Sequence, residues 1–185
     1  MDNSQNQNIP NTRINKNMRT KIILILLFGM SFSFLFAQNE RLAREAFTLK
    51  LPVNETGFYE QKVLKSPYFV KENILQLYPG EQLFIEIDTT KNEIISMKSV
   101  KENINPKKTI RIEFTQTTKD KKSELMMLMI ENPFDKDLEY KAMMFIVGHD
   151  KWLNTNVFPV KAKLTGYETW SDVIITLALS DWKFK

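Results

Sequence analysis

Apolar and polar side chains alternate along much of the chain after residue 80. The alternating stretches are 82–88, 94–100, 108–115, 157–164 and 172–179. Successive side chains of a β-strand point to opposite faces, so this period of two predicts half-buried strands. The pattern indicates an all-β protein, since no stretch after residue 80 shows a sustained helical period.

Two further stretches, 125–130 and 142–147, are apolar at every position. They are short and bounded by turn residues, which predicts central strands covered on both faces. Their methionines are expected to act as flexible core filler, because a thioether side chain adapts to irregular space. These methionines are Met126, Met127, Met129, Met143 and Met144. In total, seven strands are expected from residue 82 onward.

Turn residues separate these strands. Pro79 and Gly80 suit the two central positions of a type II turn, because glycine tolerates the positive φ required there. An Asn-Pro break at 132–137 lies between the two most hydrophobic strands. Other expected loops are 103–108, 119–122, 148–151 and the surroundings of Gly166. The charged residues in these loops are expected to remain solvated.

The region before residue 77 is less regular. Its one stretch with helical character is Glu40–Phe47, which contains leucine and alanine but is short for a stable helix. Residues 47–51 and 59–64 are expected to form a leading strand pair, or a lid, on the main domain. The predicted organisation is therefore an N-terminal extension at 38–76, followed by a sandwich at 77–185.

Two local patterns resemble bacterial immunoglobulin-like domains. Pro79-Gly80-Glu81 before an alternating strand is similar to a turn common in fibronectin-III-like modules, and 129–138 resembles a hairpin of PapD-like sandwiches. The resemblance spans about residues 77–180. It implies an immunoglobulin-like antiparallel β-sandwich of about seven strands, a fold that many unrelated functions share. No functional residue is carried over, and the Cys-Trp-Cys core of antibody domains is absent.

A basic start followed by an apolar run at residues 18–37 has the pattern of a secretory signal peptide, with cleavage expected between Ala37 and Gln38. An uncleaved single membrane helix is the alternative, because the run is of intermediate length. Residues 1–17 are polar, so they are either an extension or a sign that translation starts at Met18. The chain has no cysteine, which excludes a lipoprotein anchor.

Removing the leader changes the charge. Four of the 26 basic residues and one of the 22 acidic residues lie before residue 38, so the net charge falls from +4 to +1. The main argument for a nucleic-acid partner, the basic net charge, therefore no longer applies. Without cysteines the fold has no disulfides and must rest on packing, as in many proteins of a Gram-negative periplasm. With the signal peptide, the periplasm or the space outside the cell is the expected location.

The sequence contains few candidates for catalytic residues. His149 is the one histidine, in a turn and without a nucleophile motif nearby, and a single histidine with no cysteine argues against a zinc site. No cofactor motif is present. Glu86, Glu113 and Glu168 could in principle form a glycoside hydrolase pair, which requires two carboxylates about 5–10 Å apart.

Aromatic residues in the C-terminal third are the better candidates for binding. Trp152, Tyr167 and Trp170, with His149 beside them in sequence, form the expected binding set, and Phe158 lies among them. Loop aromatics can anchor a protein or stack on a sugar, and they can also close the ends of a core. The favoured hypothesis is an exported, non-catalytic protein that contacts another protein. The alternatives are a carbohydrate-binding module and, third, a sandwich hydrolase; the oligomeric state stays open.

Overall fold

A computed structural model describes residues 42–91 and 93–185, which form strands, turns and loops without a helix. The predicted all-β class is confirmed. All of the described residues belong to one compact unit, Arg41–Lys185. The expected signal peptide, its cleavage between Ala37 and Gln38, and the polar residues 1–17 lie outside the described residues.

Five antiparallel strands form a first sheet, called the β10 sheet below, in the order β13-β10-β9-β7-β8. Its strands are β7 (Glu81–Thr90), β8 (Glu93–Val100), β9 (Thr109–Lys119), β10 (Lys122–Glu131) and β13 (Thr165–Trp170). All of its pairings are antiparallel. The alternating sequence stretches place one row of apolar side chains on its inner face.

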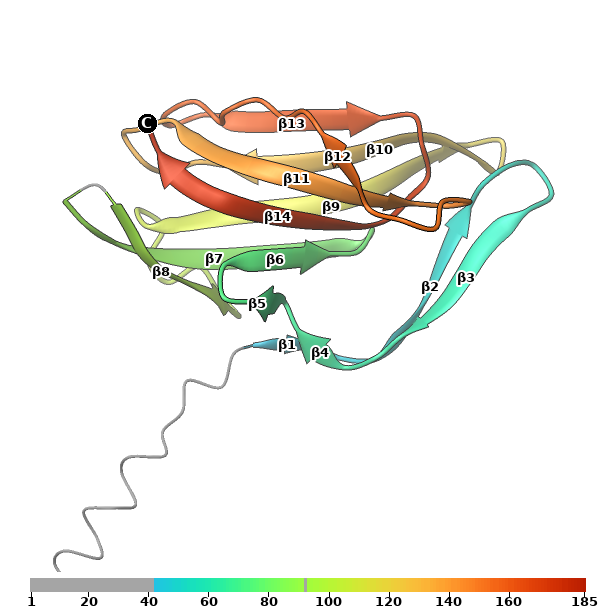
Figure 1. The fold of residues 1–185 in the computed structure, drawn as a ribbon, viewed down its shortest axis with the longest axis horizontal. Helices are drawn as coiled ribbons and strands as arrows, with labels where there is room; N and C mark the ends of the chain where they lie inside the picture. Colours follow the sequence, from blue (N-terminus) through green and yellow to red (C-terminus); the bar gives the residue numbers. More distant parts are fainter. Residues whose placement is uncertain (1–41, 92) are drawn as a thin grey trace, which may run out of the picture. The chain divides into compact units, whose positions relative to one another are not determined.

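A second antiparallel sheet, called the β11 sheet, has the order β12-β11-β14-β6-β5. Its strands are β5 (Phe69–Lys71), β6 (Ile74–Leu77), β11 (Leu138–Ile146), β12 (Leu153–Thr155) and β14 (Ile174–Phe184). The two sheets form the layers of a β-sandwich (Figure 1). The sandwich therefore contains ten strands, of which β5 and β6 precede the predicted set.

One hydrophobic core joins the two sheets. Ile85, Ile112 and Leu128 of the β10 sheet and Leu75 and Leu177 of the β11 sheet belong to one cluster of buried side chains. Burying one such side chain contributes roughly 1.5–3 kcal/mol, so this cluster supplies the main driving force for folding.

The prediction of central strands at 125–130 and 142–147 is confirmed. β10 lies between β9 and β13, and β11 lies between β12 and β14. Met126 is fully buried in the core, as expected of core filler, whereas Met127 and Met129 are half-buried on the opposite face. A strand with neighbours on both sides can carry apolar residues on both faces.

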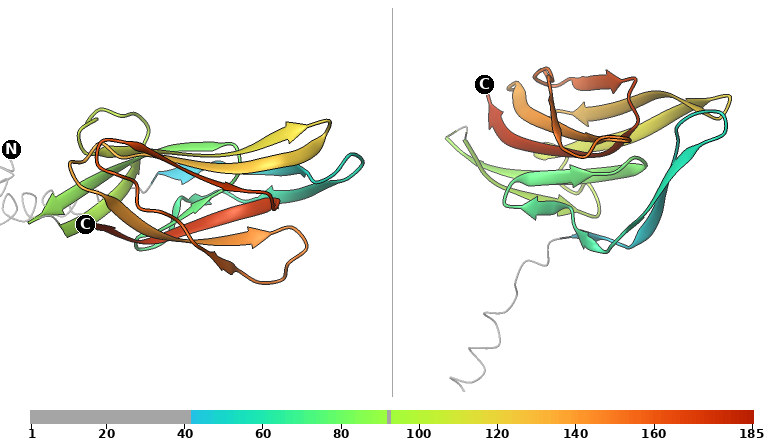
Figure 2. Two further views of the ribbon diagram at one scale, coloured as in Figure 1. Left: turned by 90° about the horizontal axis from the view of Figure 1, so that it is seen from above. Right: turned by 45° about the vertical axis from the view of Figure 1, so that its right-hand side comes forward.

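The expected leading strand pair is also present. β2 (Phe47–Pro52) and β3 (Phe58–Val63) form an antiparallel hairpin. A second apolar cluster joins Leu49, Leu51 and Val63 of this hairpin to Ile175 of β14. Figures 1 and 2 show the hairpin standing at one end of the sandwich. It covers part of the β11 sheet rather than extending either sheet.

The helical expectation for 40–47 is wrong for the described residues 42–47. Ala43–Arg44 form the short strand β1, which pairs with β4 (Ser66–Pro67), and β2 begins at Phe47. The physical reason is the buried Arg44 side chain, whose Nε lies 2.8 Å from Oε1 of Glu81. This tertiary ion pair holds an extended backbone, which outweighs the weak helix propensity of a short segment.

The strand expected at 157–164 is wrong as well. Only Val160 makes a β-bridge there, to Leu138 of β11, and Pro159 precedes it. Proline has no N–H for a ladder, so the segment remains an irregular connection. The loop expected around Gly166 is instead the strand β13. By contrast, the turn at 79–80 forms as predicted, with a φ of 93° at Gly80 and a hydrogen bond from Glu81 N to Tyr78 O of 3.1 Å.

Candidate functional site

The connection between β12 and β13, residues 156–164, is irregular in backbone but held by a buried amide. Asn132 is 1% exposed, and its Nδ2 donates to the carbonyl oxygens of Lys136 (2.8 Å) and Val160 (3.0 Å). Its Oδ1 accepts a hydrogen bond from Phe134 N at 3.0 Å. A single side chain therefore ties the β10–β11 loop to the connection.

Asp137, in the same β10–β11 loop, makes a second set of contacts with the connection. Its Oδ1 accepts a hydrogen bond from Ala162 N at 3.0 Å, and its Oδ2 lies 2.7 Å from Nζ of Lys161. The hydrogen bond from Lys161, followed by that from the Ala162 backbone, lowers the pKa of Asp137. The backbone N–H of Lys163 also donates to Phe134 O at 3.0 Å. The loop at 132–137 thus fixes the second half of the connection.

The first half of the connection is fixed against β13. The backbone N–H of Phe158 donates to Oε1 of Glu168 at 2.6 Å. Val160 packs so closely on Gly166 that a Cβ added there would lie 2.9 Å from Cγ2 of Val160. The connection is therefore held at both ends, and it lies between the edge of the β11 sheet and β13.

Exposed apolar side chains are frequent in this part of the chain. Nine large apolar residues are exposed among the described residues, and four of them fall between 152 and 167. Phe158 is 80% exposed, Leu164 58% and Tyr167 60%. We call these three residues the β12–β13 surface. Apolar side chains grouped on a rigid surface more often mark an interaction site than apolar side chains scattered singly.

The two tryptophans of the expected binding set have different neighbours. The ring of Trp152, 39% exposed, contacts the ring of Phe145 at a centroid distance of 5.6 Å. Trp170 is half-buried against the core, and its Nε1 donates to Oγ1 of Thr155 at 2.9 Å. Of the expected set, Tyr167 lies on the β12–β13 surface.

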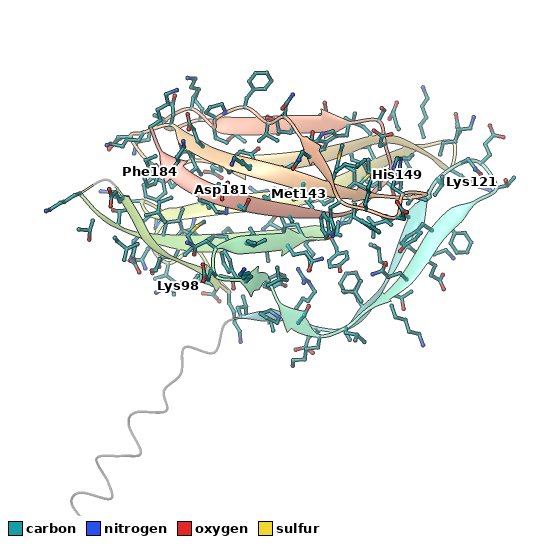
Figure 3. The ribbon with its side chains drawn as sticks, in the orientation of Figure 1. Lys98, Lys121, Met143, His149, Asp181 and Phe184 are labelled. Atoms are coloured by element: carbon teal, nitrogen blue, oxygen red, sulfur yellow. The ribbon has the colours of Figure 1, made fainter. Side chains whose placement is uncertain are left out.

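His149 lies elsewhere, in the turn after β11. Its side chain is exposed, and its backbone N–H donates to Ile146 O at 3.1 Å. Figure 3 places it toward the end of the sandwich where the β2–β3 hairpin stands. The structure therefore does not bring His149 to the β12–β13 surface.

Each of the three candidate carboxylates has a partner that fixes it. Glu86 is 6% exposed and accepts a hydrogen bond from Nδ2 of Asn105 at 2.6 Å, while Lys98 and Lys108 lie 2.9 and 3.2 Å away. Led by the bond from Asn105, these contacts lower the pKa of Glu86 to about 2. β8 and β9 pair with opposite sides of β7, so the loop 101–108 crosses β7, and Asn105 and Lys108 attach it to Glu86.

The other two carboxylates have different neighbours. Glu113 forms an ion pair with Arg111 of the same strand at 2.9 Å, and Glu168 accepts the Phe158 N–H. Glu113 pairs in register with Gln82 and Met129, whereas Glu168 packs toward the connection. No described group of three or more His, Asp or Glu side chains could hold a metal ion.

Sequence reasoning missed Leu164 as a surface residue and Asn132 and Asp137 as the residues that fix the connection. The sequence of 132–137 predicts a turn, and the asparagine and aspartates in it are residue types that commonly accept hydrogen bonds from backbone groups. Nothing local in the sequence shows that this turn binds residues 160–163. That contact links positions 28 residues apart in the chain.

No family model matches the chain, and neither the curated proteins nor the solved structures contain a match. Among the residues that the structure describes, no helix is long and apolar enough to cross a membrane.

Proposed function

We propose that this chain is a non-catalytic binding protein that contacts another protein through the β12–β13 surface. The observation that carries the proposal is Phe158, which is 80% exposed although its backbone is fixed by a 2.6 Å bond to Glu168. An exposed aromatic ring on a fixed backbone has only its own side-chain freedom to lose on binding, so it suits an interface anchor.

The character of the neighbouring side chains favours a protein over a small molecule. Leu164 and Tyr167 are also exposed, and Tyr167 stands beside Met129 on the outer face of the β10 sheet. Aromatic residues and methionine are enriched in protein interfaces. A 430 Å³ hollow lies beside the connection and is lined by Val157 and Pro159, which flank Phe158 in the chain, together with Tyr140, Lys141 and Asp181.

The two alternative functions receive less support from the geometry. A carbohydrate platform needs Trp152 and Trp170 in one exposed plane, whereas Trp170 is half-buried and bonded to Thr155. A hydrolase needs an available carboxylate pair, whereas Glu86 is held ionised by Asn105 and two lysines. We retain the carbohydrate module as the second candidate because Trp152 remains 39% exposed.

Export is part of the proposal. The apolar run at 18–37 and the absence of cysteine support a protein that works in a Gram-negative periplasm or outside the cell. The patterns at 77–81 and 129–138 support an immunoglobulin-like sandwich, whose edges and loops commonly bind proteins.

The test compares two variants in cells that produce the protein. The double variant Phe158→Ser/Tyr167→Ser is expected to reduce the native complex, seen by sizing of mildly crosslinked extracts, to the mass of the free chain. Phe58→Ser is the matched control, because Phe58 is 53% exposed but lies at the start of β3. Circular dichroism of both variants should match the wild type. A complex that survives in the double variant, or is lost equally in the control, contradicts the proposal.

A further inference from the structure

β13 is an edge strand, and no other strand of the described residues pairs with its second side, called the free side below. It lies at the end of the β10 sheet and pairs with β10 on its other side. Edge strands expose unpaired backbone groups, and proteins usually shorten or distort them. β12 and β5 have three residues each, and the β7–β8 pairing has a bulge near Thr89. β13 has six residues without such an irregularity in its pairing.

The side of β13 to which each backbone group points follows from one hydrogen bond. Asn132 N donates to Leu164 O at 3.0 Å, so the Leu164 carbonyl points toward the β10 side. Backbone groups of successive residues in a strand point to alternate sides. The N–H and C=O groups of Thr165, Tyr167 and Thr169 therefore point to the free side of β13.

These three residues form a symmetric pattern. Along β13 they follow one another as Thr165, Tyr167 and Thr169, so the residue types are the same in both directions. In an antiparallel pair of two identical strands centred on Tyr167, each Thr165 faces the partner's Thr169. Because all three residues direct their backbone groups to the free side, such a pair forms about six backbone hydrogen bonds.

We propose that a second copy of this chain pairs with β13 in this register, which joins the two β10 sheets into one continuous sheet. The inference rests on the proposed function and names the partner of that surface. A two-fold axis through Tyr167 makes the contact closed, as in most soluble homodimers.

Charge and exposure agree with this pairing. Thr165, Tyr167 and Thr169 carry no charge. On the other face of β13, Glu168 lies opposite the partner's Gly166, so the Glu168 carboxylates of the two copies are not directly opposed. Like charges directly opposite one another would destabilise the pair. Leu164, 58% exposed, comes next to the partner's Trp170, and the two Tyr167 rings meet at the axis. In this dimer Leu164 and Tyr167, two of the three residues of the β12–β13 surface, therefore contact the partner.

Cysteine crosslinking tests the register, and the chain has no cysteine of its own to interfere. In a hydrogen-bonded antiparallel pair the two Cα atoms lie about 5.5 Å apart, within the range of a disulfide. Tyr167→Cys is therefore expected to form a disulfide dimer under mild oxidation. Thr165→Cys is the matched control on the same row, because its two copies lie more than about 13 Å apart in this register.

The dimer fraction of Tyr167→Cys is expected to exceed that of Thr165→Cys at least about tenfold, since the control is beyond disulfide reach. The double variant Thr165→Cys/Thr169→Cys should again crosslink, which keeps the test valid if Tyr167→Cys folds poorly. Sedimentation of the wild-type protein should show a concentration-dependent dimer. Equal crosslinking of both single variants, or a wild-type monomer at every concentration, overturns the proposal. A complex of the wild type with a different protein in cells would then leave the proposed function standing without this partner.

Discussion

At the scale of single residues, three buried polar side chains hold irregular segments of this protein in place. Arg44 holds the N-terminal segment, Asn132 holds the connection before β13, and Glu86 holds the loop that crosses β7. Each is at most 6% exposed, and each has hydrogen bonds at the distances given above. A buried polar group without such partners costs about 1–3 kcal/mol, so these residues have narrow tolerance to substitution.

Arg44 is expected to be the most sensitive of these positions. Its guanidinium contacts Oε1 of Glu81 and lies 4.8 and 5.0 Å from the ring centroids of Tyr68 and Tyr78. Arg44→Ala leaves the Glu81 carboxylate buried without its cation, which costs about 3–5 kcal/mol in buried pairs. We expect the free energy of unfolding, measured by urea denaturation, to fall by that amount.

The control for Arg44 is an exposed ion pair. Lys141 and Asp181 approach to 2.7 Å, but their side chains are 77% and 59% exposed. Lys141→Ala is expected to change the free energy of unfolding by less than about 1 kcal/mol. Equal losses in the two variants would show that Arg44 does not act through its buried pair.

Glu86 predicts a specific pH dependence. A glutamate carboxyl titrates near 4.5 before folding, and the fold lowers its pKa to about 2. The ionised form is thus favoured in the folded state, so its contribution is complete above about 4.5 and disappears as the pH falls toward 2. The stability difference between wild type and Glu86→Gln should therefore shrink between pH 6 and pH 2.5. Urea denaturation at each pH measures it, and a difference that stays constant or grows at low pH contradicts this account.

At the scale of elements, β13 and the connection before it show where sequence reasoning stops. The apolar alternation of 157–164 predicts a strand, yet Pro159 and the ties to Asn132 and Asp137 make it a connection. The strand forms at 165–170, where Gly166 accommodates Val160. The central strands at 125–130 and 142–147 were predictable, because their apolar residues on both faces leave few alternatives.

Gly166 provides a direct test of how the connection packs on β13. Gly166→Ala places a Cβ about 2.9 Å from Cγ2 of Val160, so the Val160 side chain or one of the two backbones must move. Overpacking of this kind costs about 1–3 kcal/mol. The double variant Gly166→Ala/Val160→Ala should lose less stability than the sum of its two single variants, as measured in a double-mutant cycle. Additive losses would mean that the two residues do not press on each other.

At the scale of the whole described unit, the fold class and the candidate surface differ in how far the sequence could predict them. Alternation along single strands was sufficient for the all-β class, because it is a local signal. The order of strands in the two sheets depends on contacts such as β14 with β6, about a hundred residues apart in the chain. The exposure of Phe158 likewise depends on the contacts of its segment with Glu168 and Asn132. Neither the strand order nor this exposure could therefore be predicted from local sequence.

The arrangement of this unit leaves one rigid apolar surface beside a free sheet edge, and the central claim is that a protein binds there. The most direct measurement is photo-crosslinking in producing cells, with benzoylphenylalanine in place of Phe158 or, as control, of the exposed Phe58. A discrete protein adduct is expected at 158 and none at 58. The absence of an adduct at 158, or the same adducts at both positions, would contradict it.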